Sequence, residues 1–223
     1  MAEYSRKNPS PRYRELLEMY REMHTHGAAN ENIPADQTFD GRSLRPHAGN
    51  IRGIIEVLGS KTILDYGSGK GHQYQPMVIN TPDGQSFPDI KALWNVDEIT
   101  CYDPGHAPFH SLPEGRFDGV VSTDVLEHCP AGDIPWIIDE IFSFAEEFVY
   151  LNVACYPAHK TLPNGENAHC TLEPPEWWQA IFEKAVAAHP GLRYYSVFDI
   201  PETGAGNQNT IRQQMITGKS KPR

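Results

Sequence analysis

Long apolar runs, paired cysteines and excess positive charge are all lacking in this 223-residue sequence. No apolar stretch approaches the roughly 20 residues that cross a bilayer, and the N-terminus lacks the apolar segment of a signal peptide. The four cysteines form no Cys-X-X-Cys pair, which argues against a zinc ribbon and a disulfide scaffold. A net charge of −10 disfavours broad binding of nucleic acid. We therefore expect a cytoplasmic enzyme with a small-molecule substrate and neither nucleic-acid nor membrane partners; the sequence sets no oligomeric state.

Helical and strand patterns alternate along most of the chain. Two amphipathic helices, at 11–24 and 47–58, are expected to form an N-terminal helical cap within residues 1–60. Strands are expected at 62–66, 99–102, 118–123, 148–154, 192–200 and 210–217, and helices at 134–146 and 175–188. Strands separated by helices imply right-handed parallel units. We predict a doubly wound α/β core over residues 61–218, with tails at 1–10 and 219–223.

The strongest local motif is a glycine loop that follows an apolar strand. Residues 62–66 lead directly into Gly67-Ser68-Gly69-Lys70-Gly71. Glycines permit a tight turn and bring bare backbone against a ligand. The spacing of a phosphate-binding P-loop is absent. Asp65 lies two positions before the first glycine, where dinucleotide-binding folds usually have an apolar residue, and this acid favours S-adenosylmethionine (SAM).

A second acid follows at the place expected for a ribose ligand. Residues 99–102 form a short strand that ends at Asp103. A carboxylate in this position can accept hydrogen bonds from both ribose hydroxyls. The alternative is an acid that forms a turn before Pro104. The glycine loop upstream favours the ribose role.

A third motif, Phe-Asp-Gly-Val-Val-Ser-Thr-Asp-Val-Leu-Glu-His, occupies residues 117–128. With the other two motifs it resembles the class I SAM-dependent methyltransferases, specifically over about residues 60–155. The resemblance implies a Rossmann-like, mainly parallel seven-stranded sheet whose last strand is antiparallel. The sequence departs from the family at 72–80, where a helix is compressed, and at 104–116, where little room remains for a third strand and an adenine-binding acid.

The resemblance also implies which residues bind SAM. The glycine loop would line the methionine and ribose, Asp103 would hold the ribose diol, and Thr123 and Asp124 would lie under the sulfonium. The implied cofactor-binding set is Asp65, Gly67, Ser68, Gly69, Gly71, Asp103, Thr123 and Asp124.

Residues that contact a second substrate are expected near the strand ends. Asn152 lies in an otherwise apolar strand, and Tyr156 begins a long polar segment, 156–173. Segments of that length within compact domains are usually functional or disordered. Asn152 is either a hydrogen-bonded buried amide or a substrate-facing group. We predict Asn152, Tyr156 and Asp124 as catalytic residues.

Aromatic side chains could cover a sulfonium, because aromatic faces stabilise positive charge. Tyr20, Phe39 and Tyr156 are the candidates for this role. The segment 39–47 could close over the cofactor or be an ordinary polar connector. Core packing explains the four tryptophans, which are Trp94, Trp136, Trp177 and Trp178.

A metal site is the alternative reading of the third motif. Asp124, Glu127, His128 and His169 resemble the ligand set of metal-dependent 2′-O-methyltransferases that act on the ends of small RNAs. Oxygen and imidazole ligands suit Mg²⁺ or Mn²⁺. The same Asp-Val-Leu-Glu-His run is common in class I methyltransferases without a metal, where the acid and histidine tie down the following turn. Because the chain is acidic, we predict no metal.

We expect the protein to transfer a methyl group from SAM to a small polar acceptor. A first alternative is chemistry on SAM itself, in which its amino group attacks its γ-carbon and releases methylthioadenosine and azetidine-2-carboxylate. This alternative rests on a general resemblance to methyltransferase-like azetidine-2-carboxylate synthases. Further alternatives are a metal-dependent RNA 2′-O-methyltransferase and a non-catalytic partner subunit with this fold.

Overall fold

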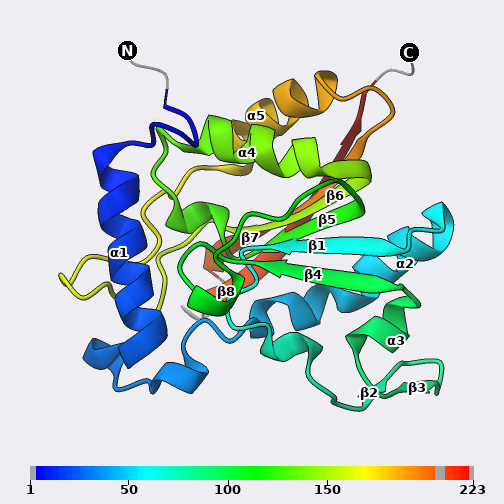
Figure 1. Ribbon diagram of the computed structural model, residues 1–223, viewed down its shortest axis with the longest axis horizontal. Helices are drawn as coiled ribbons and strands as arrows, with labels where there is room; N and C mark the ends of the chain where they lie inside the picture. Colours follow the sequence, from blue (N-terminus) through cyan, green and yellow to red (C-terminus); the bar gives the residue numbers. More distant parts are fainter. Residues whose placement is uncertain (1–3, 204–208, 221–223) are drawn as a thin grey trace.

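The computed structural model describes residues 4–203 and 209–220 (Figure 1). Its centre is a six-stranded sheet in the order β4-β1-β5-β6-β7-β8. Among the described strands of this sheet, β8 alone runs antiparallel, against β7. The strands are β1 (Thr62–Tyr66), β4 (Glu98–Tyr102), β5 (Phe117–Thr123), β6 (Ala145–Ala154), β7 (Arg193–Thr203) and β8 (Asn209–Lys219). The mainly parallel α/β fold and the antiparallel last strand are confirmed.

The sheet has six strands across the described ranges, not the seven that the family resemblance implies. The segment 104–116 after β4 forms turns and one short 3₁₀ helix, η5 (Ala107–Phe109). Prolines 104, 108 and 113 interrupt it. Proline donates no backbone hydrogen bond and is excluded from strand interiors, so this segment cannot add the strand.

Helices cover both faces of the sheet (Figure 1). One face packs against α4 and α5 in a core that includes Phe142, Trp178 and Phe182. The other face packs against α2 and α3, which contribute Ile51 and Trp94. These helices are α2 (Ala48–Leu58), α3 (Ile90–Trp94), α4 (Ile134–Phe144) and α5 (Pro175–Ala187). The central parallel strands β1, β5 and β6 are therefore buried on both sides, as the nearly continuous apolar sequence at 148–154 predicts for β6.

The predicted first helix is α1 (Pro11–His26), which extends two residues beyond the expected end. Ser10 caps it, because its hydroxyl accepts a hydrogen bond from the Tyr13 amide, and Pro11 occupies the first turn. Three 3₁₀ helices follow α1: η1 (Ala29–Glu31), η2 (Ala35–Gln37) and η3 (Arg42–His47). The chain then enters α2, which begins at Ala48 rather than at residue 47.

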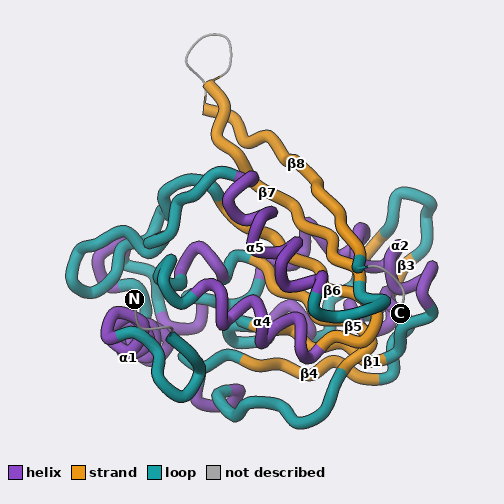
Figure 2. The backbone as a smooth tube through the Cα atoms, turned by 90° about the horizontal axis from the view of Figure 1, so that it is seen from above, coloured by secondary structure: helices purple, strands orange, loops and turns teal. Residues whose placement is uncertain are grey.

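Short elements between β1 and β4 were not predicted. The family's helix after the glycine loop is reduced to η4 (His72–Tyr74), in agreement with the compression noted at 72–80. A small hairpin, β2 (Ile79–Asn80) and β3 (Ser86–Phe87), and the one-turn helix α3 complete the connection. A further 3₁₀ helix, η6 (Leu126–His128), follows β5. At the opposite edge, the far ends of β7 and β8 extend beyond the body of the molecule (Figure 2).

The cap and the segment 156–170 share a small core of their own. Leu16, Met23 and Ala28 pack there with Leu162 and Ala168. We call this group the cap cluster. Hydrogen bonds reinforce it, since the Glu31 carboxylate accepts from the amide and hydroxyl of Thr161, both at 2.8 Å. The long polar segment is therefore anchored to the cap by buried apolar side chains.

The predicted N-terminal tail is wrong for residues 4–10. Arg6 donates hydrogen bonds to Glu140 on α4 and to the hydroxyls of Tyr66 and Tyr102. The amide of Ser10 donates to Asp133 at 3.0 Å. At the other end, Lys219 belongs to β8, while residues 221–223 of the predicted C-terminal tail lie outside the described residues. In the described part of the chain, the longest helices are too short or too polar to traverse a bilayer.

Candidate functional site

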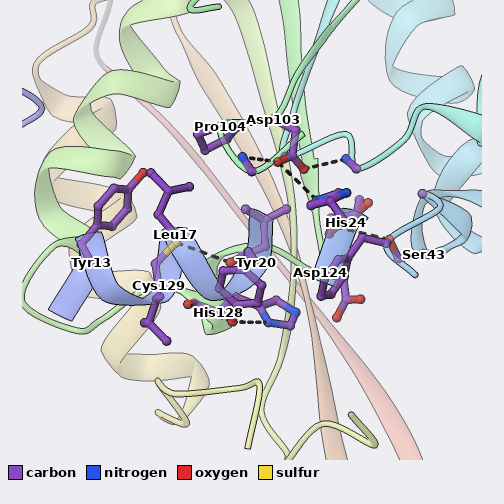
Figure 3. Close-up of a pocket in the computed structure, with 18 of the residues that line it drawn as sticks. Tyr13, Leu17, Tyr20, His24, Ser43, Asp103, Pro104, Asp124, His128 and Cys129 are labelled. Carbon is purple, nitrogen blue, oxygen red and sulfur yellow. Dashed lines mark hydrogen bonds and ion pairs between the residues drawn. The ribbon is translucent and has the colours of Figure 1, made fainter. Parts of the chain in front are cut away.

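A cleft with an enclosed volume of about 130 Å³, open to solvent on one side, lies at the carboxyl ends of β1, β4 and β5. The chain leaves β1 for β4 on one side and later returns to β5 on the other side. In open α/β sheets ligands bind at such a switch point. Helix α1 runs across the cleft and contributes apolar and aromatic side chains to it (Figure 3).

The glycine loop is shaped by another segment of the protein as well as by the cleft. Gly67 and Gly69 line the cleft and have left-handed backbone conformations, with φ of 85° and 58°. A Cβ atom on Gly69 would lie 2.1 Å from the carbonyl oxygen of Phe39. That same oxygen accepts a hydrogen bond from the Lys70 amide at 2.8 Å. The segment that begins at Phe39 therefore packs directly on the loop. Its closure over a cofactor stays a prediction.

Two predicted loop residues lie away from the cleft lining. Ser68 is buried, and a Cβ on Gly71 would meet the ring of Phe109 at 3.0 Å. His24 joins the loop to the cap, because Lys70 donates to its carbonyl oxygen at 2.9 Å. Burial, together with the positive charge of Lys70, lowers the pKa of His24 to about 3. This imidazole is therefore neutral at physiological pH.

Asp65 supports the loop from behind and does not line the cleft. Asp65 is only 2% exposed. Its carboxylate accepts hydrogen bonds from Gln73 Nε2 and Tyr74 Oη, both at 2.8 Å. Burial raises the pKa of Asp65 to about 7, against the effect of these two donors. The contacts of Asp65 in this structure therefore support the loop, whereas the family resemblance implies a contact with SAM.

Asp103 follows β4 and lines the cleft beside the glycine loop. One carboxylate oxygen accepts from the Gly69 amide and the other from the Gly105 amide, both at 2.8 Å. Burial raises the pKa of Asp103, while the backbone donors oppose that shift. A carboxylate offers about four lone-pair positions. Asp103 can therefore accept two further hydrogen bonds from a ligand.

Thr123 and Asp124 reach the cleft from the end of β5. Asp124 adopts φ of 60°, and its side chain is 43% exposed. Phe39 is the other non-glycine cleft residue with a left-handed backbone, at φ of 52°. Such conformations cost free energy and cluster at functional sites. The two strained residues therefore mark the cleft independently of its motifs.

Two histidines lie beside Asp124. The ligand atoms of Asp124, His128 and His169 all lie within 4.8 Å of one another. Burial raises the pKa of Asp124, but the neighbouring side chains of His169, His128 and Lys160 outweigh it and lower the pKa to about 2. Burial also lowers the pKa of His128 to about 4. Among the residues that the structure describes, these three are close enough together to hold a metal ion.

Glu127, the remaining member of the sequence-derived set, has a different position. It is 0% exposed, and its carboxylate accepts a hydrogen bond from the Ala154 amide. Its backbone carbonyl accepts from the amides of Cys170 and Thr171. Glu127 thus ties η6 to the end of β6 and to the segment after His169, which is the anchoring role that the sequence offered as its alternative.

Asn152 is a hydrogen-bonded buried amide. Its Nδ2 donates to Asp199 at 2.9 Å and to the carbonyl of Val197 at 3.2 Å, and it does not line the cleft. Tyr156 also lies outside the cleft lining, although its carbonyl accepts from His169 Nδ1 at 2.6 Å. Catalytic roles for both residues stay predictions, and their contacts are structural.

Of the aromatic candidates, Tyr20 and Phe39 line the cleft. The tryptophans belong to the core or pack against it, as expected. Sequence analysis missed several cleft residues: Tyr13, Leu17, His24, Ser43 and Cys129. Tyr13 and Leu17 lie on the amphipathic face of α1, so their apolar spacing was the available signal.

Comparison with known proteins assigns no family. No protein-family model matches the sequence, and no curated protein is significantly similar to it.

Proposed function

We propose that the protein transfers a methyl group from SAM to a small polar acceptor. The observation that carries the proposal is the convergence of three strand ends on one cleft: the bare backbone of Gly67 and Gly69, the carboxylate of Asp103, and Asp124. The enclosed part of the cleft, about 130 Å³, is smaller than the roughly 300–1,000 Å³ typical of small-molecule sites, so SAM would also occupy its solvent-exposed mouth. Its residues offer contacts for both the nucleoside and the sulfonium of SAM.

The nucleoside part of SAM would lie beside Asp103. The two remaining lone-pair positions of this carboxylate match the two ribose hydroxyls. Leu17, Pro104 and Cys129 provide the neighbouring apolar surface for adenine (Figure 3). The family's adenine-binding acid after a third strand is missing here. In its place, adenine would contact this apolar surface, to which α1 contributes Leu17.

The sulfonium would lie at the other end of the cleft. Asp124 provides a negative charge there, and the rings of Tyr20 and Phe39 pack edge-to-face at 5.6 Å. Aromatic faces and a carboxylate both stabilise a cation. When the methyl group leaves, the sulfonium becomes a neutral thioether, so these contacts favour substrate over product in the site.

The reaction is an in-line displacement, and the protein contributes mainly orientation and exclusion of water. Helix α1 and the segment that begins at Phe39 cover the cleft from above. The acceptor would approach from the side of Asp124, His128 and Ser43. Polar side chains at this end and the limited volume favour a small polar molecule over a macromolecule.

Calorimetric titration with S-adenosylhomocysteine tests the binding site. We expect micromolar affinity or better, and a loss of about 1–3 kcal/mol in Asp103→Asn, because the charge-assisted bonds to ribose are weakened. Asp97→Asn is the matched control, since Asp97 is exposed just before β4. Equal affinity in wild type and Asp103→Asn would remove Asp103 from the site.

Mass spectrometry of the protein incubated with SAM alone separates methyl transfer from cyclisation. We expect SAM to stay intact, because Asn152, the residue predicted to hold the amine, is engaged by Asp199 and lies outside the cleft lining. Protein-dependent release of methylthioadenosine and azetidine-2-carboxylate would overturn the methyl-transfer proposal.

A further inference from the structure

Three potential ligands from two distant parts of the chain meet at one end of the cleft. Asp124 follows β5, His128 belongs to η6, and His169 lies in the segment attached to the cap cluster. The Nε2 atom of His169 is 3.6 Å from Asp124 Oδ1, and the two imidazole rings meet at 87° with centroids 4.6 Å apart. Asp124 and His128 lie at the cleft lining (Figure 3).

Hydrogen bonds fix the tautomers of both imidazoles. Nδ1 of His128 lies 3.0 Å from the carbonyl oxygen of Ala168, and Nδ1 of His169 lies 2.6 Å from the carbonyl oxygen of Tyr156. The Tyr20 hydroxyl also lies 3.0 Å from Nδ1 of His128, but it donates its single proton to the Ala168 carbonyl at 2.8 Å. A carbonyl oxygen accepts and never donates, so each Nδ1 carries the proton. In each neutral ring the lone pair is therefore on Nε2. A backbone carbonyl behind the ring is also the usual outer partner of a metal-binding histidine.

The tautomers leave three electron-pair donors facing one another. Nε2 of His128, Nε2 of His169 and the Asp124 carboxylate lie within 4.8 Å. With both rings neutral, none of these atoms has a proton to share with the others. A cation among them turns mutual repulsion into attraction. Either a proton on one imidazole or a metal ion can supply that charge.

We infer that Asp124, His128 and His169 form a site for one divalent transition-metal ion. Two imidazole nitrogens and one carboxylate suit Mn²⁺, Fe²⁺, Co²⁺ or Zn²⁺, whereas Mg²⁺ and Ca²⁺ prefer oxygen ligands. Ligand atoms that share an ion at about 2.1 Å lie roughly 3–3.5 Å apart. The 3.6 Å between His169 and Asp124 is close to this spacing.

The site has three protein ligands rather than the four that the sequence suggested. Glu127 is fully buried and its carboxylate is engaged by the Ala154 amide. Three ligands leave open coordination positions, and the exposure of Asp124 directs them toward the cleft. A bound divalent ion lowers the pKa of an oxygen ligand. If the proposed methyl transfer holds, the acceptor is therefore a hydroxyl compound, and the rings of Tyr20 and Phe39 face the sulfonium while Asp124 holds the metal ion. The metal site itself does not depend on that proposal.

Titration with Co²⁺ and with Mn²⁺ tests the site without any turnover. We expect about one Co²⁺ per chain, with visible absorption bands, and competition by Mn²⁺ or Zn²⁺. His128→Asn and His169→Asn retain a side-chain amide that can donate to the same carbonyls but lack the Nε2 ligand. Removing the group that is hydrogen-bonded to a metal-binding histidine lowers metal affinity by about 10–100-fold. Each variant lacks the ligand itself, so its Co²⁺ affinity should fall by at least this factor.

His159→Asn is the matched control, because His159 is an exposed histidine of the same segment. Its Co²⁺ affinity should equal that of wild type. Circular dichroism and thermal unfolding establish that each variant is folded. Absence of Co²⁺ binding in wild type, or equal binding in folded His128→Asn and His169→Asn, would assign the cluster to an imidazolium–carboxylate pair and overturn the inference.

S-adenosylhomocysteine binding, measured on protein treated with EDTA, separates this inference from the proposed function. Binding of the nucleoside without Co²⁺ binding would overturn the metal site alone. Co²⁺ binding without nucleoside binding would overturn the proposed methyl transfer alone.

Discussion

The buried carboxylate of Asp65 should make the stability of the fold depend on pH, and Asp65→Asn should remove that dependence. Burial raises the pKa of Asp65 from 3.8 to about 7. The asparagine keeps the side-chain oxygen that accepts from Gln73 and Tyr74. The substitution thus removes a charge while retaining most of the local geometry.

The direction follows from linkage between protonation and folding. Because the folded pKa is the higher one, the carboxyl group costs nothing below about pH 4, where both states are protonated. The cost grows as pH rises and becomes constant above about pH 7. At roughly 1.4 kcal/mol per pKa unit, this cost is about 1–2 kcal/mol at pH 5 and about 4 kcal/mol at pH 8. The stability gained by Asp65→Asn should therefore be larger at pH 8 by about 2–3 kcal/mol.

Urea unfolding followed by tryptophan fluorescence at pH 5 and pH 8 measures this difference. Asp97→Asn removes an exposed carboxylate just before β4, the strand that pairs with β1, and is the control for a general charge effect. The same gain for Asp65→Asn at both pH values would mean that Asp65 is ionised in the folded protein at an ordinary pKa. That result would refute the argument from burial.

Two further predictions concern the contacts around the cleft. Gly69→Ala should abolish binding of S-adenosylhomocysteine in calorimetry, because its Cβ would lie 2.1 Å from the Phe39 oxygen. Gly84 also has a positive φ but open space around it, so Gly84→Ala should retain binding. Arg6→Met should lower the free energy of unfolding by about 1–3 kcal/mol in urea titrations, because it leaves the mostly buried carboxylate of Glu140 without its cation; an unchanged urea midpoint would contradict this role.

The sequence predicted the order and type of the long elements well, because strand and helix periods differ clearly there. It could not place Asp65. In a parallel strand buried on both faces, apolar residues do not alternate with polar ones, so nothing indicated which face this acid occupies. The hairpin of β2 and β3 was missed because each strand has only two residues.

The candidate site was predicted at its motifs and missed where distant segments meet. Gly67, Gly69, Asp103 and Asp124 line the cleft as expected. The contact of Gly69 with the Phe39 carbonyl depends on tertiary packing and leaves no local pattern in the sequence. The pairing of His169 with Asp124 is likewise set by Leu162 and Ala168 in the cap cluster, which hold the long segment in place.

The left-handed conformations of Phe39 and Asp124 imply a compromise between stability and function. Each strained non-glycine residue costs on the order of 1–3 kcal/mol, in a fold whose net stability is typically about 5–15 kcal/mol. Glycine would adopt either conformation without strain. Selection for stability alone would therefore favour glycine at both positions. A ring and a carboxylate at these two points are expected only if what occupies the cleft requires them.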